Sequence, residues 1–166
     1  MIDPTPDPLE TVRTLLLRIG DREARQQVGK TLALWELGYL REALTQFRIT
    51  AEQALRRILE HGVAAKSARP LVARLDQGQC ATVIERLYND LEVIPARIAL
   101  HLHTLLGWGN YASHHQKQGH RARATDLSVL ISIAVDLDDW ITTEVEGGGS
   151  IFDPEHLARV VQQAET

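Results

Sequence analysis

Hydrophobic residues recur at helical spacing along most of this chain. The clearest stretch runs from residue 39 to residue 61, where apolar side chains repeat three and four positions apart for about six turns. Its apolar set is Leu40, Ala43, Leu44, Phe47, Ala51, Ala54, Leu55, Ile58 and Leu59. The opposite positions are mostly charged: Arg41, Glu42, Arg48, Glu52, Arg56, Arg57 and Glu60. We predict a long amphipathic helix, and we interpret its charged stripe as a solvated surface.

Two shorter amphipathic segments precede this stretch, and residues typical of helix ends mark their limits. Asp7 followed by Pro8 predicts an N-cap and a first helical position, and apolar residues continue at helical spacing up to Gly20. Asp21 predicts the cap of a second helix, which ends before Gly38.

Four further helices are predicted after residue 62. A short one starts at Pro70, a second spans residues 80–91, and Pro95 opens a third. Thr125 or Asp126 caps the last long helix. The predicted core positions are Leu71, Val72 and Leu75 in the short helix, Ile98, Leu102, Leu105 and Leu106 after Pro95, and Leu127, Leu130, Ile131, Ala134, Leu137, Trp140 and Ile141 in the last.

The sequence lacks the signals of strands, since it has neither a sustained alternation of apolar and polar residues nor an Asn-Gly hairpin turn. We therefore predict an all-α fold, an antiparallel helical bundle of about five to seven helices. The bundle is expected to span residues 1–146, with a loose leader at 1–7. A flexible Gly/Ser linker, either native or engineered, follows at 147–150. Residues 151–166 predict a short amphipathic helix that docks on the bundle or binds another chain.

Composition and charge narrow the class of protein. At 166 residues the chain is long enough for one hydrophobic core but short for two domains. Its 44% hydrophobic and 24% charged residues are typical of a globular protein. A net charge of −4 argues against a nucleic-acid binder that uses its whole surface, although a local basic patch is compatible with it. No stretch approaches the roughly 20 apolar residues of a membrane span, and the start is acidic, so we expect no membrane helix and no signal peptide. Cys80 is the only cysteine, so no internal disulfide can form, and a cytoplasmic location is expected.

Five of the seven histidines lie between positions 101 and 120, which raises the question of a metal site. Zinc needs about four converging nitrogen or sulfur ligands. His101 and His103 are two positions apart, so a regular helix points them to opposite sides. His114, His115 and His120 have no cysteine or His-x3-His partner to complete a site. We therefore expect no metal and no cofactor.

Other catalytic signatures are equally weak. Cys80 stands at a predicted helix start with no nearby histidine, so we interpret it as a buried structural residue. The chain has no G-x-S-x-G turn, no P-loop and no G-x-G-x-x-G motif. Asp136, Asp138 and Asp139 are interpreted as one exposed helix face, and not as an acid pair or a magnesium site.

The segment from His114 to Arg123 is the one basic stretch. Its cations are Lys117, Arg121 and Arg123, which could meet a phosphate backbone or an acidic partner. Only Tyr111 lies close enough to offer an aromatic ring for base stacking. A solvated loop remains the simpler interpretation.

Two segments of the chain resemble the HEPN superfamily of helical bundles. The first runs from Gly38 to Arg48 and continues through Glu52-Gln53-Ala54-Leu55-Arg56. The second is His103-Thr104-Leu105-Leu106-Gly107-Trp108-Gly109-Asn110-Tyr111-Ala112-Ser113-His114, followed by a helix that ends near Trp140. Together they cover residues 39–145, and the chain looks similar to HEPN-like domains of unknown function in prokaryotic defence and signalling proteins.

This resemblance carries an expectation about catalysis. Catalytic HEPN proteins are metal-independent ribonucleases that use Arg-x(4–6)-His, often with Asn after the Arg, paired across a dimer. When Asn110 and His114 are aligned on that motif, Gly109 stands where the arginine belongs, and glycine offers no cation for the phosphate. A diverged ribonuclease would have to use His114, His115, Asn110 and Arg121.

A second formal match to the motif, from Arg97 to His103, fails on geometry. The two residues lie about 240° apart around the helix that Pro95 opens, so they would not converge.

The same segment also has a purely structural interpretation, as a turn at which helices meet. Gly107 and Gly109 flank Trp108 and would permit a close backbone approach or a distorted turn. If the segment is helical instead, Asn110 and His114 are neighbours one turn apart and can share hydrogen bonds. We take Trp108, Asn110, Tyr111 and His114 as the residues of a structural junction or a binding site.

These observations favour a non-catalytic HEPN-like module that acts by protein–protein interaction or dimerisation in a prokaryotic defence or regulatory system. Its expected partner is another protein or a second copy of the chain. The alternatives are a diverged HEPN-type ribonuclease, with RNA as its weakly supported partner, and a nucleotide or small-ligand sensor with a pocket near Trp108, Asn110 and His114.

Overall fold

The computed structural model describes residues 7–114 and 122–147, and every regular element in these ranges is helical. This confirms the predicted all-α bundle. The elements are α1 (Pro8–Leu16), α2 (Arg22–Glu36), α3 (Leu40–Gly62), α4 (Ala65–Asp76), α5 (Cys80–Glu85), the π-helical η1 (Arg86–Asp90), α6 (Ala96–His114), α7 (Ala124–Trp140) and the π-helical η2 (Ile141–Glu146). The predicted Gly/Ser linker beyond Gly147 and the predicted helix at 151–166 lie outside the described residues.

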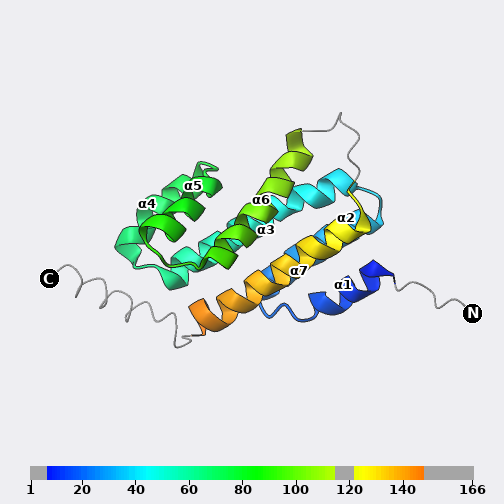
Figure 1. Cartoon of the computed structure of the whole chain (residues 1–166), viewed down its shortest axis with the longest axis horizontal. Coiled ribbons are helices and arrows are strands. Elements are labelled where there is room, and N and C mark those ends of the chain that lie inside the picture. The colour runs from blue at the N-terminus through cyan, green and yellow to red at the C-terminus, as the bar shows by residue number, and fades with distance from the viewer. Residues whose placement is uncertain (1–6, 115–121, 148–166) are drawn as a thin grey trace, which may run out of the picture.

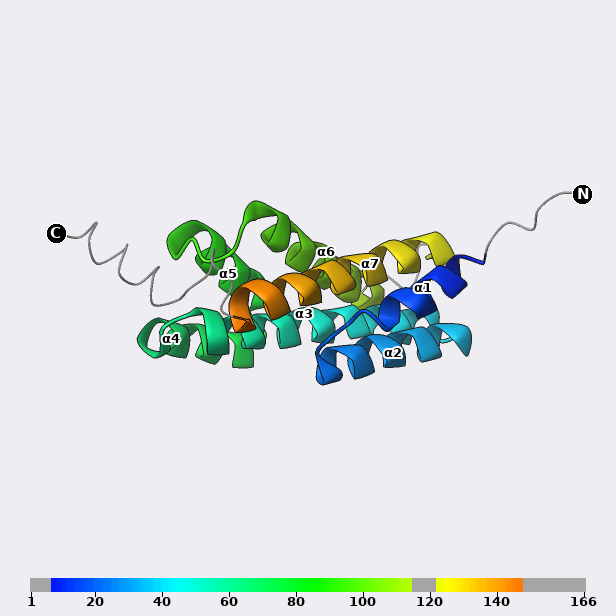
Figure 2. The ribbon, with the colours of Figure 1, turned by 90° about the horizontal axis from the view of Figure 1, so that it is seen from below.

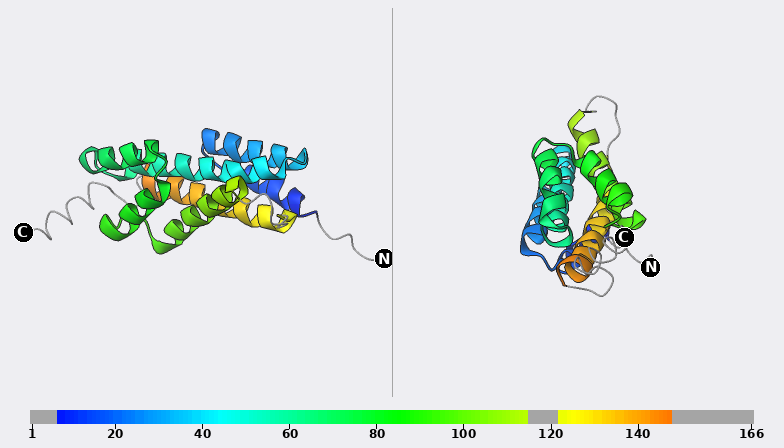
Figure 3. Two further views of the ribbon diagram at one scale, coloured as in Figure 1. Left: turned by 90° about the horizontal axis from the view of Figure 1, so that it is seen from above. Right: turned by 90° about the vertical axis from the view of Figure 1, so that its left-hand side faces the viewer.

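The helices form two layers with the long helix α3 at the centre (Figures 1 and 2). One layer holds α2, α3 and α4, and the other holds α5, α6 and α7, as the view from above also shows (Figure 3). Helix α3 contacts both its layer neighbours and the helices of the second layer, while α1 packs mainly on α7. Helices α6 and α7 are therefore outer helices, each with one face toward solvent.

Local chemistry sets the first helix boundaries as the sequence predicts. The Asp7 side chain accepts a hydrogen bond from the Leu9 backbone N–H at 3.0 Å, and Pro8 takes the first helical position. Asp21 Oδ2 likewise accepts from the Ala24 N–H at 2.9 Å and caps α2. Gly38 ends that helix with a φ of +88°, a left-handed conformation that side chains disfavour.

The predicted apolar stripes form one continuous core. All but one of the apolar positions predicted for α3 are buried, the exception being the half-buried Leu40. The core positions predicted for α6 and α7 are all buried as well. Periodicity alone therefore identified the faces that pack.

Two helix starts differ from the prediction. Helix α4 begins at Ala65, five residues before Pro70, which lies inside the helix. The stretch 65–69 buries only Ala68, so it carries no apolar period that could reveal the first turn. Helix α7 is capped at Arg123, because Asp126 reaches back from the first turn to accept the Arg123 backbone N–H at 2.8 Å.

None of the described helices combines the length and the apolar character needed to cross a membrane.

Candidate functional site

Residues 107–114, which we expected to form a turn, are the last two turns of α6. Gly109 faces α3 so closely that an added Cβ would lie 2.7 Å from the Arg48 backbone nitrogen and 2.8 Å from the Arg48 Cβ. The two helices therefore cross in backbone contact at this glycine, as the structural interpretation predicts. Gly107 faces open space, so the expected close approach on its side is wrong.

This crossing leaves no room for a larger residue at position 109. There the backbone of α3 occupies the space that a side chain would need. A guanidinium could be carried there only if α3 and α6 moved apart. The glycine at position 109 is thus part of how the bundle packs.

The other residues predicted around the motif do not gather at one site. Trp108 is half-buried against the core, and its ring meets Tyr111 edge-on with centroids 6.4 Å apart. Asn110 is exposed, and two helical positions from Trp108 place it on the other side of α6. His114 ends α6, and its side chain lies outside the description.

The predicted basic loop falls almost wholly outside the described residues, which leaves His115, Lys117, His120 and Arg121 without a structural account. Arg123 is exposed at the start of α7. A cationic side chain that the sequence did not place near the end of α6 is Arg41. Its Nε donates to the Ala112 carbonyl at 3.2 Å. Carbonyls in the last turn of a helix lack internal partners, so Arg41 helps to cap α6.

A cluster of charged side chains lies where α6 and α7 meet. Asp136 of α7 accepts from Arg97 and from His101 Nε2, the latter at 2.7 Å. Partial burial acts to raise the pKa of Asp136, but hydrogen bonds from His101 and Arg97 outweigh it, so the pKa lies below its usual value. Arg97 and Asp136 remain about half exposed, while His101 is largely covered. We call this group the Asp136 cluster.

His103 points elsewhere, to Glu85 of α5 at 3.0 Å. His101 and His103 thus contact different helices, as their spacing of two positions predicts. Arg97 and His103 also do not converge, as predicted from their separation around the helix. Within residues 7–114 and 122–147, no group of three or more His, Cys, Asp or Glu side chains is arranged to hold a metal ion. Cys80 is buried, and desolvation raises the pKa of its thiol, which is unlike a reactive nucleophile.

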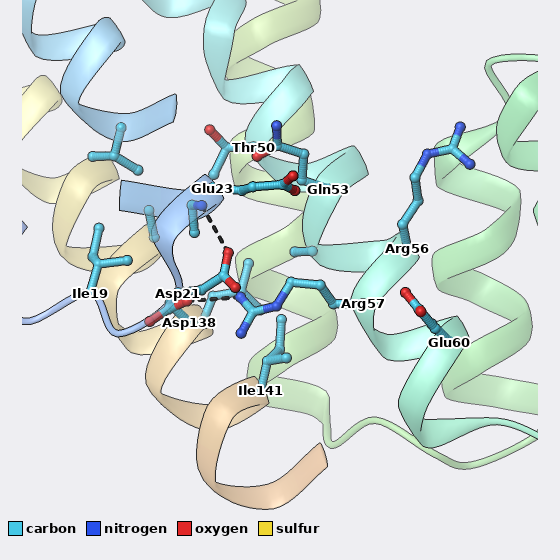
Figure 4. A pocket seen from close by; sticks show the side chains of 15 residues that line it. Ile19, Asp21, Glu23, Thr50, Gln53, Arg56, Arg57, Glu60, Asp138 and Ile141 are labelled. Atoms are coloured by element: carbon cyan, nitrogen blue, oxygen red, sulfur yellow. Dashed lines mark hydrogen bonds and ion pairs between the residues drawn. The ribbon is translucent and has the colours of Figure 1, made fainter. Parts of the chain in front are cut away.

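Asp138, which we expected on an exposed face with Asp136 and Asp139, is instead buried and is 4% exposed. Its Oδ1 accepts from the Arg57 guanidinium at 2.8 Å (Figure 4). Its Oδ2 accepts from the Gly20 backbone N–H at 3.0 Å. Desolvation acts to lower the pKa of Arg57, but hydrogen bonds to Glu146 and Asp138 raise it on balance. Arg57 is therefore a nearly buried ion-pair partner that joins α3 to α7, and its assignment to a solvated stripe is wrong.

Spacing could have revealed this pair. Asp138 continues the series Leu127, Ile131 and Ala134, which places it on the core face of α7. Buried carboxylates are rare without a cationic partner. A carboxylate on an apolar stripe is thus a signal that a cation comes from another helix.

A search of protein-family models, curated proteins and solved structures finds no match for this chain.

Helices α6 and α7 carry two of the six exposed large apolar side chains among the described residues. Leu100 of α6 is 66% exposed, and Val129 of α7 is 59% exposed. Leu100 lies one turn beyond Arg97, and Val129 lies two turns before Asp136 on the same stripe of α7. Because α6 and α7 are joined at the Asp136 cluster, we describe Leu100, Val129 and that cluster together as the α6–α7 face.

Proposed function

We propose that this chain is a non-catalytic helical module that associates with a second copy of itself through the α6–α7 face. The observation that carries the proposal is the exposure of Leu100 and Val129 beside the Asp136 cluster. Single exposed apolar residues are common on soluble proteins. Leu100 lies one turn from Arg97, and Val129 lies two turns, roughly 10 Å, from Asp136 on the same stripe of α7. We take these two side chains and the half-exposed charges between them as one contact surface with a polar part.

The charge pattern of this face suits a copy of itself. In a two-fold dimer the same patch meets itself, so residue i of one copy faces residue j of the other in both directions. Arg97 and Asp136 supply a cation and an anion on one patch, and each can face its opposite across the axis. A patch with one sign of charge would repel its copy instead.

The area of the face sets the expected strength of association. Helix α7 has 17 residues and is therefore roughly 25 Å long, and two neighbouring helices are about 20 Å wide. As a flat rectangle the face covers roughly 500 Å², so the contact falls in the range of small interfaces and not of large permanent ones. We accordingly expect a dimer whose population changes with protein concentration.

The crossing at Gly109 supports the non-catalytic part of the proposal, since the position of the catalytic cation is filled by α3. The resemblance to HEPN proteins, which work as pairs, supports self-association and a role in a prokaryotic defence or regulatory system. The alternative that the resemblance offers, a diverged ribonuclease built on His114, is best separated by experiment.

The test is sedimentation equilibrium of the wild type, Leu100→Glu and Val129→Glu over a wide concentration range. We expect the wild type to shift from monomer to dimer and both variants to stay monomeric. Leu37→Glu is the matched control, because Leu37 is 72% exposed but lies in the connection between α2 and α3. A wild type that is monomeric throughout, or equal loss of dimer in the control, would refute the proposed interface.

An RNA-cleavage assay completes the test. Cleavage by the wild type that disappears in His114→Ala, with an unchanged thermal melt, would establish the ribonuclease alternative. Absence of cleavage at concentrations where the dimer forms is the expected result.

A further inference from the structure

Helix α6 presents one line of residues on the outside of the bundle (Figure 3). Leu100, Thr104 and Gly107 follow one another four and three positions apart, so they lie along one side of the helix. Leu102 and Gly109, which are buried, lie on the opposite side. The line formed by Leu100, Thr104 and Gly107 therefore faces away from the core, and we call it the α6 stripe.

The α6 stripe has a projection and a recess. Leu100 is 66% exposed. Gly107 lies seven residues further, roughly 10 Å along the helix, and a Cβ added there would have no neighbouring heavy atom within 4 Å. Glycine is disfavoured inside a helix relative to alanine, and the contact with Arg48 accounts for Gly109 but not for Gly107. A recess that no other part of the described chain fills suits a side chain from another molecule.

Helix α7 presents a matching line of residues. Val129, Ser132 and Asp136 follow one another three and four positions apart, and we call them the α7 stripe. Leu127 and Ala134, on the opposite side of the helix, are buried. Val129 is 59% exposed, so it projects from α7 as Leu100 projects from α6.

The hydroxyl groups at the middle of both stripes are already hydrogen-bonded within their own helices. Thr104 Oγ1 donates to the Leu100 carbonyl at 2.8 Å, and Ser132 Oγ donates to the Ser128 carbonyl at 2.8 Å. Burying a hydroxyl is costly when its donor loses water without gaining a partner. Covering the two stripes would leave neither hydroxyl without an acceptor, so their middle parts can be buried.

The Asp136 cluster fixes how α6 and α7 are placed along each other. Arg97 and His101 of α6 both reach Asp136 of α7, and the two helices run in opposite directions (Figure 1). Gly107 lies six to ten positions beyond these contacts on α6. It is therefore level with residues six to ten positions before Asp136 on α7, which are residues 126–130. Val129 is one of them, so the recess and this projection lie at the same height.

We infer that α6 of one copy packs on α7 of the second copy, related by a two-fold axis parallel to these helices, with Val129 of each copy in the recess at Gly107 of the other. This pairing rests on the self-association proposed above and names the helix that each α6 binds. Such an axis leaves the height of every residue unchanged, so the recess of one copy meets the projection of the other twice. The paired helices run in opposite directions, which also suits their dipoles.

Charge favours this axis over one perpendicular to the helices. With the parallel axis, Arg97 lies level with Asp136 of the second copy, so opposite charges meet at both ends of the contact. A perpendicular axis at Thr104 would pair α6 with α6. It would place Arg97 and Asp136 of the second copy on opposite sides of the axis, roughly 20 Å apart along the helices. At that separation salt screens their attraction.

The experiment exchanges the projection and the recess and follows the full-length chain by sedimentation equilibrium. Gly107→Val should weaken the dimer more than about tenfold, because two side chains would then compete for one space. Val129→Ala should weaken it as well, by removing the projection. The double variant Gly107→Val, Val129→Ala should dimerise more tightly than Gly107→Val alone, because the valine at position 107 then meets the alanine at position 129.

Asn110→Val is the matched control, since Asn110 is exposed on the same helix but lies off the α6 stripe. We expect it to dimerise as the wild type does, and thermal melts of dilute samples should show every variant folded. A double variant no tighter than Gly107→Val, with a dimeric wild type, would overturn the helix pairing and leave the proposed self-association standing. A wild type that is monomeric throughout would overturn both.

Disulfide trapping tests the same pairing directly. Chains carrying Gly107→Cys are mixed with chains carrying Val129→Cys at a concentration where the dimer forms, and are then mildly oxidised. A disulfide needs Cα atoms within about 7 Å, so we expect a cross-linked pair in the mixture and none with either variant alone. Cys80 is buried and does not compete. Cross-linking of Gly107→Cys with itself, or equal cross-linking when Asn110→Cys replaces it in the mixture, would overturn the pairing.

Discussion

The contact between Gly109 and Arg48 allows a sharp test of the helix crossing, because Gly107 provides its control two residues away. Gly109→Ala would place a Cβ 2.7 Å from a backbone nitrogen and 2.8 Å from another Cβ. Neither atom can move by rotating a side chain, so α3 and α6 would have to separate. Gly107→Ala would place its Cβ in open space on the same helix.

The two substitutions share one energy term and differ in the other. Alanine is favoured over glycine inside a helix by about 1 kcal/mol, and this gain applies at both positions. Overpacking costs about 1–3 kcal/mol, and the rigid contact at Arg48 places Gly109→Ala near the upper end. The expected net effect is a loss of about 2 kcal/mol for Gly109→Ala and a gain of about 1 kcal/mol for Gly107→Ala.

Thermal unfolding followed by circular dichroism measures both effects. A domain of this size shifts its Tm by about 2–4 °C per kcal/mol, so we expect a fall of about 4–8 °C for Gly109→Ala and a rise of about 2–4 °C for Gly107→Ala. If Gly109→Ala melts at or above the wild-type temperature, the helices do not cross in backbone contact there. The support that this crossing gives to the proposed non-catalytic module would then be lost as well.

Three further predictions follow from individual contacts. Arg57→Met should lower the free energy of unfolding, measured with urea, by about 3–5 kcal/mol, because it leaves Asp138 buried without its cation. The double variant Arg57→Met, Asp138→Leu should lose less free energy than the sum of the two single variants. The pKa of Asp136 is lowered in the folded state, so the charged Asp136 stabilises the fold above the unfolded pKa near pH 4, and this stability is lost as the pH falls below that value. Asp136→Asn should therefore reduce the loss of folding free energy between pH 5 and pH 3. An unchanged loss would contradict the ion-pair cluster. Gln53→Met should leave the urea midpoint unchanged or raise it, since it removes an unpaired buried oxygen, whereas a loss above about 1 kcal/mol would show that the amide is satisfied in the free protein.

The sequence predicted the bundle well because burial follows helical periodicity. The long stripe of α3 packs as its spacing requires, and Asp7 and Asp21 cap the helices they were expected to cap. These features depend only on residues within a few positions of one another. Pro70 shows the limit, since the first turn of α4 has no apolar period and a proline inside a helix resembles a helix start.

The candidate sites were harder to predict because they combine side chains from distant parts of the chain. Helical spacing already leaves Leu100 and Val129 off the predicted core stripes, but only the packing of α6 on α7 shows that the two belong to neighbouring helices. The buried ion pair needs α3 and α7 together, since Arg57 and Asp138 lie 81 positions apart in the sequence. The close approach at Gly109 could be predicted in part, because a glycine inside a helix suggests that another backbone lies near but does not identify which one.

The histidines of α6 and the aspartates of α7 show how one geometric rule separates a true cluster from an apparent one. Residues two positions apart on a helix point about 200° away from each other. His101 and His103 accordingly contact different helices, α7 and α5. The rule applies equally to Asp136 and Asp138, which are also two positions apart in the sequence. Asp136 faces outward to Arg97 and His101, while Asp138 faces inward to Arg57. The run of acidic residues is therefore not one surface: α7 contributes Asp136 to the proposed interface and Asp138 to the buried ion pair with Arg57.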